Sequence, residues 1–161
     1  MANTYTQIHI HIVFTVKNRE SLIREAFRDE LEKYICGILR QKRHKTLAIY
    51  CMPDHLHLLV GLNPAEAIAT LVRDIKTGAS ALIKEKRWIQ GQFNWQEGYG
   101  AFSHAKSQID TVVQYILNQP VHHQKRTFRD EYLDMLAKAG VDYDDAYLFD
   151  WLDDTSVGDE S

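Results

Sequence analysis

Cysteines, long apolar runs and repeated segments are scarce or absent in this sequence. Cys36 and Cys51 are the only cysteines, and they lie in apolar surroundings without a Cys-x-x-Cys spacing. We therefore expect reduced core residues of a cytosolic protein and no disulfide framework. No apolar run approaches the ~20 residues that a membrane helix needs. Residues 1–7 lack a basic segment followed by an apolar one, so no signal peptide is predicted.

Several catalytic signatures are missing as well. Cyclic phosphodiesterases with paired histidine motifs need Ser or Thr two residues after each histidine, and those positions are occupied by His11, His57 and Leu59. The sequence also has no P-loop, no Ser-His-Asp nucleophile elbow and no dinucleotide-binding glycine pattern. These enzyme classes are set aside.

The charge of the chain is unevenly distributed. The composition, with 45% apolar and 25% charged residues, is that of one soluble globular domain. Residues 1–129 contain 18 Lys and Arg against 11 Asp and Glu, a balance of +7, whereas residues 130–161 contain one Lys against 11 Asp and Glu, a balance of −10. A basic body with an acidic tail is compatible with binding to a polyanion, although an acidic tail also serves solubility alone.

Periodicity and turn residues divide the chain into strands and helices. Alternation of β-branched and aromatic residues predicts strands, and apolar residues spaced by three and four predict helices. Asn63 and Ser107 are expected to begin helices and Pro120 to end one. The expected strands are residues 4–16, 46–52, 55–62 (a hairpin through a turn at 53–54) and 88–103 (broken by a loop at 98–100), and the expected helices are residues 21–43, 63–86, 107–119 and 128–139.

The order β-α-β-β-α-β followed by helices predicts an α+β fold. It is the ferredoxin-like order, an antiparallel sheet with helices on one face, to which C-terminal helices are added. We expect a functional domain at residues 1–128 and a C-terminal helix with an acidic tail at 129–161, disordered from about Asp153. This fold alone does not indicate a function, because ferredoxin-like sheets carry many unrelated activities.

His55 and His57 are candidate metal ligands. On a strand, residues two apart point to the same face, so the two imidazoles lie side by side while Leu56 and Leu58 face the core. Two neutral imidazoles and one side-chain oxygen leave positions open on a divalent ion for water and phosphate oxygens. A second His-x-His pair, at 9 and 11, is expected to be structural or at most to support the ligands.

Tyr115 and Gln119 form the second candidate set. They lie four residues apart near the end of a predicted helix, so the phenol and the amide share a face. Tyr115 falls outside the apolar stripe of that helix, which makes it a candidate nucleophile. An unperturbed phenol has a pKa of ~10, so it needs a metal ion or another cation nearby to attack. Gln119 is the candidate third ligand through its carbonyl oxygen, and Asn118 is its rival.

Basic and aromatic residues are interleaved around these segments. Cations bind phosphates, and aromatic rings stack on unpaired bases. For Trp95 and Phe102, packing within the sheet is the simpler interpretation. The candidate DNA-binding cations are Lys17, Arg19, Arg73, Lys76, Lys106, Lys125 and Arg126.

Together these segments resemble the single-tyrosine HUH transposases of small bacterial insertion sequences and their REP-associated relatives. The HUH element corresponds to His55-Leu56-His57 in MPDHLHLLV, and the tyrosine element corresponds to YILNQ with the two histidines that follow. The segments HIVFTVKNRESLI and WQEGYGAFS also resemble that family, and the likeness covers roughly residues 5–128.

The resemblance implies a transposase that cuts and rejoins single-stranded DNA through a 5′-phosphotyrosine intermediate. His55, His57 and Gln119 would bind Mg²⁺ or Mn²⁺, and Tyr115, on a catalytic helix at about 107–119, would attack the scissile phosphate. Family members act as homodimers with active sites shared between the chains, and they recognise hairpins near the ends of the element. The implied location is the bacterial cytoplasm, at the nucleoid.

Three alternatives stay open at this point. A rolling-circle initiator or relaxase-type nickase uses the same chemistry, but such proteins are usually larger and often place the tyrosine motif differently. A domesticated, non-catalytic protein that binds single-stranded nucleic acid would be indifferent to metal and to Tyr115→Phe. A structural Zn²⁺ site would make the thermal stability sensitive to chelators and would give no nuclease activity.

Overall fold

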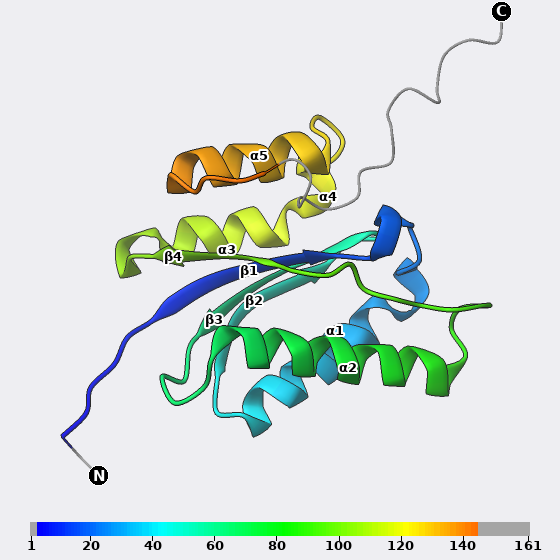
Figure 1. Cartoon of the computed structure of the whole chain (residues 1–161), viewed down its shortest axis with the longest axis horizontal. Coiled ribbons are helices and arrows are strands. Elements are labelled where there is room, and N and C mark those ends of the chain that lie inside the picture. The colour runs from blue at the N-terminus through cyan, green and yellow to red at the C-terminus, as the bar shows by residue number, and fades with distance from the viewer. Residues whose placement is uncertain (1–2, 145–161) are drawn as a thin grey trace, which may run out of the picture.

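The structure, a computed structural model, describes residues 3–144 and contains a four-stranded antiparallel sheet between two groups of helices (Figure 1). The element order confirms the predicted ferredoxin-like α+β fold. The strands are β1 His9–Thr15, β2 Lys45–Cys51, β3 His55–Gly61 and β4 Gly100–His104. The helices are α1 Glu25–Gln41, α2 Ile68–Lys86, α3 Ile109–Leu117, α4 Gln119–His122 and α5 Phe128–Ala139, with 3-10 turns η1 Lys17–Arg19 and η2 Lys106–Gln108.

The two histidines of interest lie on a central strand. The strand order is β2-β3-β1-β4, so β3 is paired on both sides and all neighbours are antiparallel. In the pairing of β1 with β3, Val13 is opposite His57 and Thr15 is opposite His55. In the extended backbone of β3 successive side chains point to opposite faces of the sheet, and pairing on both edges fixes its register.

One face of the sheet carries the main hydrophobic core. Leu56, Leu58 and Val60 of β3 point to this face and are fully buried. They pack against α1 and α2, which lie together on that side (Figure 1). Full burial of each such side chain contributes roughly 2 kcal/mol to folding. This burial orients β3 and leaves His55 and His57 on the opposite face.

The opposite face is covered by α3, α4 and α5 (Figure 1). Two smaller apolar clusters attach these helices to the sheet, one under α3 and one under α5. The members are Val112 and Ile116 of α3 with Ala48 and Leu59, and Phe128, Tyr132 and Leu136 of α5 with Val13 and Phe102. The histidine pair therefore lies in a layer between the sheet and these three helices.

Three predicted helix starts are wrong by a few residues. α1 begins at Glu25 instead of residue 21. α2 begins at Ile68, because the Asn63 side chain bonds to backbone groups around a turn instead of capping a helix. Its Oδ1 accepts from the Ala65 N–H and its Nδ2 donates to the Lys42 carbonyl, both at 3.1 Å. Ser107 lies inside η2 and does not cap α3, which begins two residues later.

The predicted strand at 88–103 is also mostly absent. Only its end forms β4, and Trp95 makes an isolated bridge to Val16. Trp95 is held by its side chain, since its indole N–H donates to the Lys76 carbonyl at 3.1 Å and its ring packs edge-on against Phe14. Pro120 does not stop the helical path either: α4 follows α3 at once, with the proline in its first turn, where an N–H is not needed.

The two cysteines and the tail complete the description. Cys51 is buried, Cys36 is half-buried, and both are free. Within residues 3–144 no helix has the length and apolar character to cross a membrane. Residues 145–161, where disorder from about Asp153 was expected, lie outside the described residues.

Candidate metal and nucleophile site

His55 opens β3 and is 1% exposed. Its Nδ1 lies 2.7 Å from Oδ1 of Asp54, which is also paired with Arg19 at 3.3 Å. Burial opposes ionisation of Asp54, but His55 and Arg19 outweigh it and lower the pKa of this carboxyl. A carboxylate only accepts hydrogen bonds, so in the neutral ring Nδ1 carries the proton and the Nε2 lone pair faces the site.

His57 is fully buried and is supported from behind by a second histidine. Its Nδ1 lies 2.8 Å from Nε2 of His11, on β1. Burial, and then the neighbouring His55, lower the pKa of His57 to about 4, so the ring is neutral at pH 7. Burial and the contact with His57 likewise lower the pKa of His11. His11 thus occupies the supporting position that the sequence allowed for it.

Gln119 directs its carbonyl oxygen at the histidines. Its Nε2 donates to the Tyr115 backbone carbonyl at 3.4 Å, which turns Oε1 toward His123 Nε2 at 2.9 Å and His55 Nε2 at 3.5 Å. With the His55 proton on Nδ1, two acceptor atoms face each other across 3.5 Å. A cation between them would stabilise that arrangement.

Two further residues, His123 and Glu131, join the cluster, and neither was predicted from the sequence. Glu131, on α5, is 3% exposed. Its Oε1 lies 2.8 Å from His57 Nε2 and its Oε2 lies 2.9 Å from His123 Nε2. These contacts outweigh the burial of the carboxyl and hold the pKa of Glu131 below its usual range. One ligand atom each from His55, His57, His123 and Glu131 lies within 4.8 Å of the others.

A signal for only one of these two was present in the sequence. Tyr115, Gln119 and His123 are spaced by four residues, so a helical path through the proline places them on one face. Glu131 has no such local signal, because its position depends on how α5 packs on the sheet.

Two buried atoms of the cluster fit a metal ion. His57 Nε2 and Glu131 Oε1 form no hydrogen bond with any described residue, although they lie only 2.8 Å apart. A buried polar atom without a hydrogen bond is costly, and these two atoms are in contact with each other only as an ion pair. Neutral imidazole nitrogens with carboxylate and amide oxygens are donors for a divalent cation. The residues present therefore fit the ion that the sequence suggested.

Tyr115 stands next to this cluster on the half-buried side of α3. Its ring lies 5.9 Å from the His57 ring between centroids, at an angle of 86°. Burial, and then the negative charge of Glu131, raise the pKa of the phenol, whereas the Arg126 charge lowers it. Tyr115 is therefore protonated at pH 7, and further positive charge in the cluster would make it a better nucleophile.

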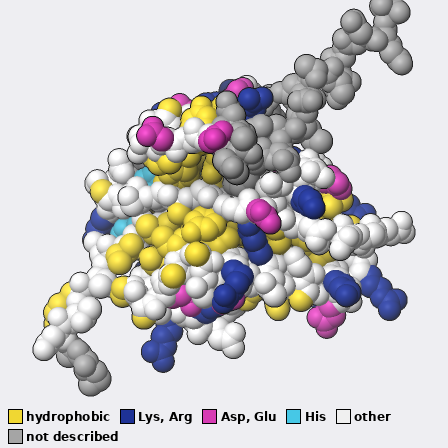
Figure 2. Space-filling model, in the orientation of Figure 1, with side chains coloured by type: hydrophobic (Ala, Val, Ile, Leu, Met, Phe, Trp, Pro, Cys, Tyr) yellow, Lys and Arg dark blue, Asp and Glu magenta, His cyan; other side chains and the backbone are white. Residues whose placement is uncertain are grey.

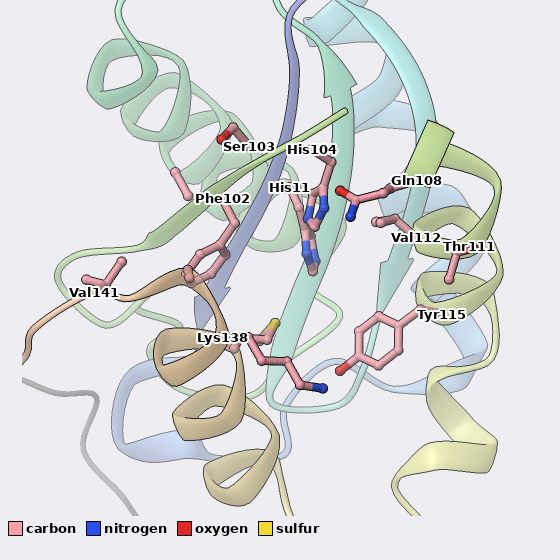
Figure 3. A pocket seen from close by; sticks show the side chains of 13 residues that line it. His11, Phe102, Ser103, His104, Gln108, Thr111, Val112, Tyr115, Lys138 and Val141 are labelled. Carbon is pink, nitrogen blue, oxygen red and sulfur yellow. The ribbon is translucent and has the colours of Figure 1, made fainter. Parts of the chain in front are cut away.

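A pocket of about 620 Å³ opens beside Tyr115. In Figure 3 the tyrosine extends from α3 with its hydroxyl directed into the pocket, opposite Lys138 of α5. Phe102 and His104 line the pocket from the sheet edge. Aromatic, polar and cationic side chains together suit an unpaired nucleotide.

Three of the seven predicted DNA-binding cations lie near the cluster. Arg19, Lys125 and Arg126 line a second hollow, of about 480 Å³, which also includes His123 and Phe128. Arg19 is already bonded to Asp54, and its guanidinium lies 5.6 Å from the Phe128 ring centroid. His123 of the cluster lines this hollow, whereas His11 and Tyr115, beside the cluster, line the pocket.

The other four cations are dispersed. Arg73 and Lys76 are on α2, across the sheet from Tyr115 (Figure 1). The Lys76 ammonium donates to the carbonyls of Gln96 and Gly98, and burial lowers its pKa to about 8. Lys17 and Lys106 lie in the single turns η1 and η2, and both are exposed. On the face shown in Figure 2 the described Lys and Arg side chains stand singly among other types.

Comparisons with known proteins give a consistent result. The model of the IS200-like transposase family matches residues 4–119. The ISDra2 transposase TnpA of Deinococcus radiodurans is 29% identical over 121 residues, covering 70% of this chain and 84% of that protein. The IS200 transposase of Salmonella typhimurium is 29% identical over 90 residues, covering 53% of this chain and 57% of that protein. The structure of a REP-associated tyrosine transposase bound to a REP hairpin shares the fold, with 18% identity and a TM-score of 0.59 over 100% of this chain and 97% of that one.

Proposed function

This chain belongs to the IS200-like transposase family, and we propose that it cuts and rejoins single-stranded DNA through a covalent bond to Tyr115. As a member of that family it is a DNA transposase. One observation carries the proposal for its chemistry: a phenol directed into an open pocket has its ring 5.9 Å from that of His57, a member of a buried metal-ligand cluster.

The reaction requires no co-reactant. The Tyr115 oxygen attacks the scissile phosphorus, the bond to the 3′-oxygen breaks, and that oxygen leaves as a 3′-hydroxyl with the proton that the phenol gave up. The 5′-phosphate is then esterified to the tyrosine. Attack by a 3′-hydroxyl on this ester reverses the step and joins a DNA end. One phosphodiester bond is exchanged for another, so cutting and rejoining have similar free energies.

His55, His57 and Gln119 would hold the divalent ion, Mg²⁺ or Mn²⁺, that the resemblance implies. When bound, such an ion supplies positive charge that polarises the phosphate and favours the phenolate. Asp54 and His11 hold the two imidazoles with their Nε2 atoms toward the site. Burial keeps bulk water away from the cluster, which strengthens every charge interaction inside it.

Single-stranded DNA with hairpin ends is the proposed ligand. The REP hairpin in the structural relative motivates this class of DNA. We assign an unpaired base near the cut to the pocket beside Tyr115, and neighbouring phosphates to the hollow lined by Arg19, Lys125 and Arg126. DNA contacts by Lys17, Arg73, Lys76 and Lys106 stay predictions.

The direct test is a search for the covalent adduct. Single-stranded oligonucleotides that span the DNA flanking this gene are labelled on the 3′ side of possible cut sites. They are incubated with the protein and Mn²⁺ or Mg²⁺ and run on a denaturing gel. Because the 5′-phosphate stays on the tyrosine, we expect a labelled, protease-sensitive band of reduced mobility that EDTA prevents.

The alternatives give different gels. Binding without an adduct on any flanking strand would contradict the proposal and favour a non-catalytic single-stranded DNA-binding protein. A metal-dependent nick without an adduct would mean that water, not Tyr115, is the nucleophile. A large loss of thermal stability in EDTA, with no cleavage under any condition, would indicate a structural Zn²⁺ site.

A homodimer is the proposed assembly, and we propose that each chain supplies the tyrosine of its own site. Tyr115 already lies beside His57 of its own chain, whereas the resemblance implies sharing between chains. When Tyr115→Phe and His57→Ala chains are co-expressed with different tags and purified together, we expect no cleavage, since neither chain has a complete site. Recovered cleavage would support shared sites, and each variant with itself is the matched control.

The functional unit and its location follow from these proposals. The expected domain boundary at 128 falls at the start of α5, whose Glu131 is part of the cluster. We therefore propose that residues 1–139 act together and that the acidic segment beyond them is accessory. Action on chromosomal DNA would place the protein in the bacterial cytoplasm, at the nucleoid.

A further inference from the structure

Glu131 brings a buried carboxylate to the cluster from α5, which follows the residues 4–119 matched by the family. A glutamate that is 3% exposed is rare unless it is paired or bound to a metal. Its two oxygens are directed at two different imidazoles, His57 and His123. The carboxylate thus lies among the predicted ligands and does not face solvent.

The separations within the cluster are those of ligands that share one ion. Two ligand atoms at right angles on an ion, each with a bond of ~2.1 Å, lie ~3 Å apart, and ligands on opposite sides lie ~4 Å apart. Glu131 Oε1 and His57 Nε2 are 2.8 Å apart, and Gln119 Oε1 and His123 Nε2 are 2.9 Å apart. The widest spread of the four cluster atoms stays within 4.8 Å, so small side-chain shifts suffice.

The supporting hydrogen bonds leave the right atoms available. His55 is held through Nδ1 by Asp54, and His57 is held through Nδ1 by His11. Metal-binding histidines are normally held in this way, with one ring nitrogen on a protein partner and the other on the ion. His57 Nε2 and Glu131 Oε1, the two atoms without a hydrogen bond, then have a common partner.

We propose that Glu131 and His123 are metal ligands together with His55 and His57, so that α5 completes the metal site of this transposase. The inference rests on the proposed function, which assigns the ion to the histidine pair. With the Gln119 oxygen, a set of three imidazoles, one carboxylate and one amide oxygen binds Mn²⁺ and later transition ions better than Mg²⁺. Mg²⁺ prefers oxygen ligands and retains its water, whereas imidazole nitrogen suits the transition ions.

Mn²⁺ binding to the full chain, measured by calorimetry without DNA, tests the assignment. Glu131→Gln keeps the shape of the side chain and removes its charge, so we expect the affinity for Mn²⁺ to fall about 10–100-fold. The wild-type protein should bind Mn²⁺ at least about tenfold more tightly than Mg²⁺. Glu66→Gln is the matched control, because Glu66 also contacts a buried histidine, His44, at 3.1 Å and takes no part in the cluster.

The outcomes separate this inference from the proposed function. Equal Mn²⁺ affinity in the wild type and Glu131→Gln would overturn the inference, and so would tighter binding, which would mean that the carboxylate competes with the ion. Thermal unfolding in EDTA checks that each variant is folded, and Glu131→Asp, which retains the charge, should recover part of the affinity. Adducts formed by Glu131→Gln with unchanged Mn²⁺ dependence would leave the proposed function intact and remove Glu131 from the metal site.

Discussion

Replacing Tyr115 with phenylalanine is expected to lower adduct formation by at least about 10³-fold, because the variant lacks the attacking oxygen. The ring itself remains, so its packing beside His57 and His122 is preserved. Affinity for single-stranded DNA should stay close to that of the wild type, since none of the predicted cations changes. The measurement is the labelled adduct on a denaturing gel, with DNA binding followed by fluorescence anisotropy.

Tyr34→Phe provides the control for the loss of a phenolic hydroxyl. Tyr34 lies on α1, is 41% exposed and belongs to the helix layer on the far side of the sheet. That variant should form adducts at the wild-type rate. If Tyr115→Phe still formed a protease-sensitive adduct, the nucleophile would have to be a different residue and the central assignment would be wrong.

Replacing His57 with alanine is expected to reduce metal-dependent cleavage at least about 10²-fold and to weaken the fold as well. The change removes one of the paired ligands. It also removes the contact between His57 Nδ1 and His11 Nε2, which lie 2.8 Å apart. It also leaves a cavity and takes one partner from the buried Glu131 carboxylate. We expect the free energy of unfolding to fall by about 3 kcal/mol. Single-turnover cleavage and chemical denaturation measure the two effects separately.

His44→Ala distinguishes a lost ligand from a weakened fold. His44 is buried and contacts the Glu66 carboxylate, as His57 contacts Glu131. It lies immediately before β2 and outside the cluster. Its loss should destabilise the protein to a similar extent while folded molecules cleave at the normal rate. Comparable losses of cleavage in both variants would show that the His57 effect is one of folding.

The fold could be predicted where burial decides the structure. Leu56, Leu58 and Val60 alternate with His55, His57 and Leu59, so the strand and the face of the two histidines follow from the sequence. The helix at 128–139 was also predicted at its observed bounds, since Thr127 accepts from the Asp130 N–H and a glycine follows the last turn.

Predictions failed where side chains bond to the backbone instead of following their usual preference. Asn63 serves a turn instead of capping a helix. Trp95 lies in an aromatic stretch whose pattern predicts a strand. Its indole N–H donates to the Lys76 carbonyl, and its backbone forms only a single β-bridge, to Val16. Such contacts depend on distant segments, so local propensity does not contain them.

The candidate site shows the same division. The predicted ligands His55, His57 and Gln119 meet in the structure, and Tyr115 lies beside them. Each belongs to a pattern with a period of two or four residues, which the sequence displays. Glu131 lies 74 residues after His57 in the sequence, and the packing of α5 brings the two together. No local sequence pattern predicts that contact.

Because side chains alternate along β3, the number of residues in the turn between β2 and β3 affects which face of the sheet each side chain occupies. An extra residue between Cys51 and His55 that shifted the pairing of β3 by one position would exchange the two faces of the strand, so that imidazoles would enter the aliphatic layer and leucines would line the site. Loops ordinarily accept insertions easily, but this turn also supplies Asp54, which holds His55. We therefore expect the connection between α2 and β4 to tolerate changes in length. The short turn between β2 and β3 should not, because its length and Asp54 position the metal ligands.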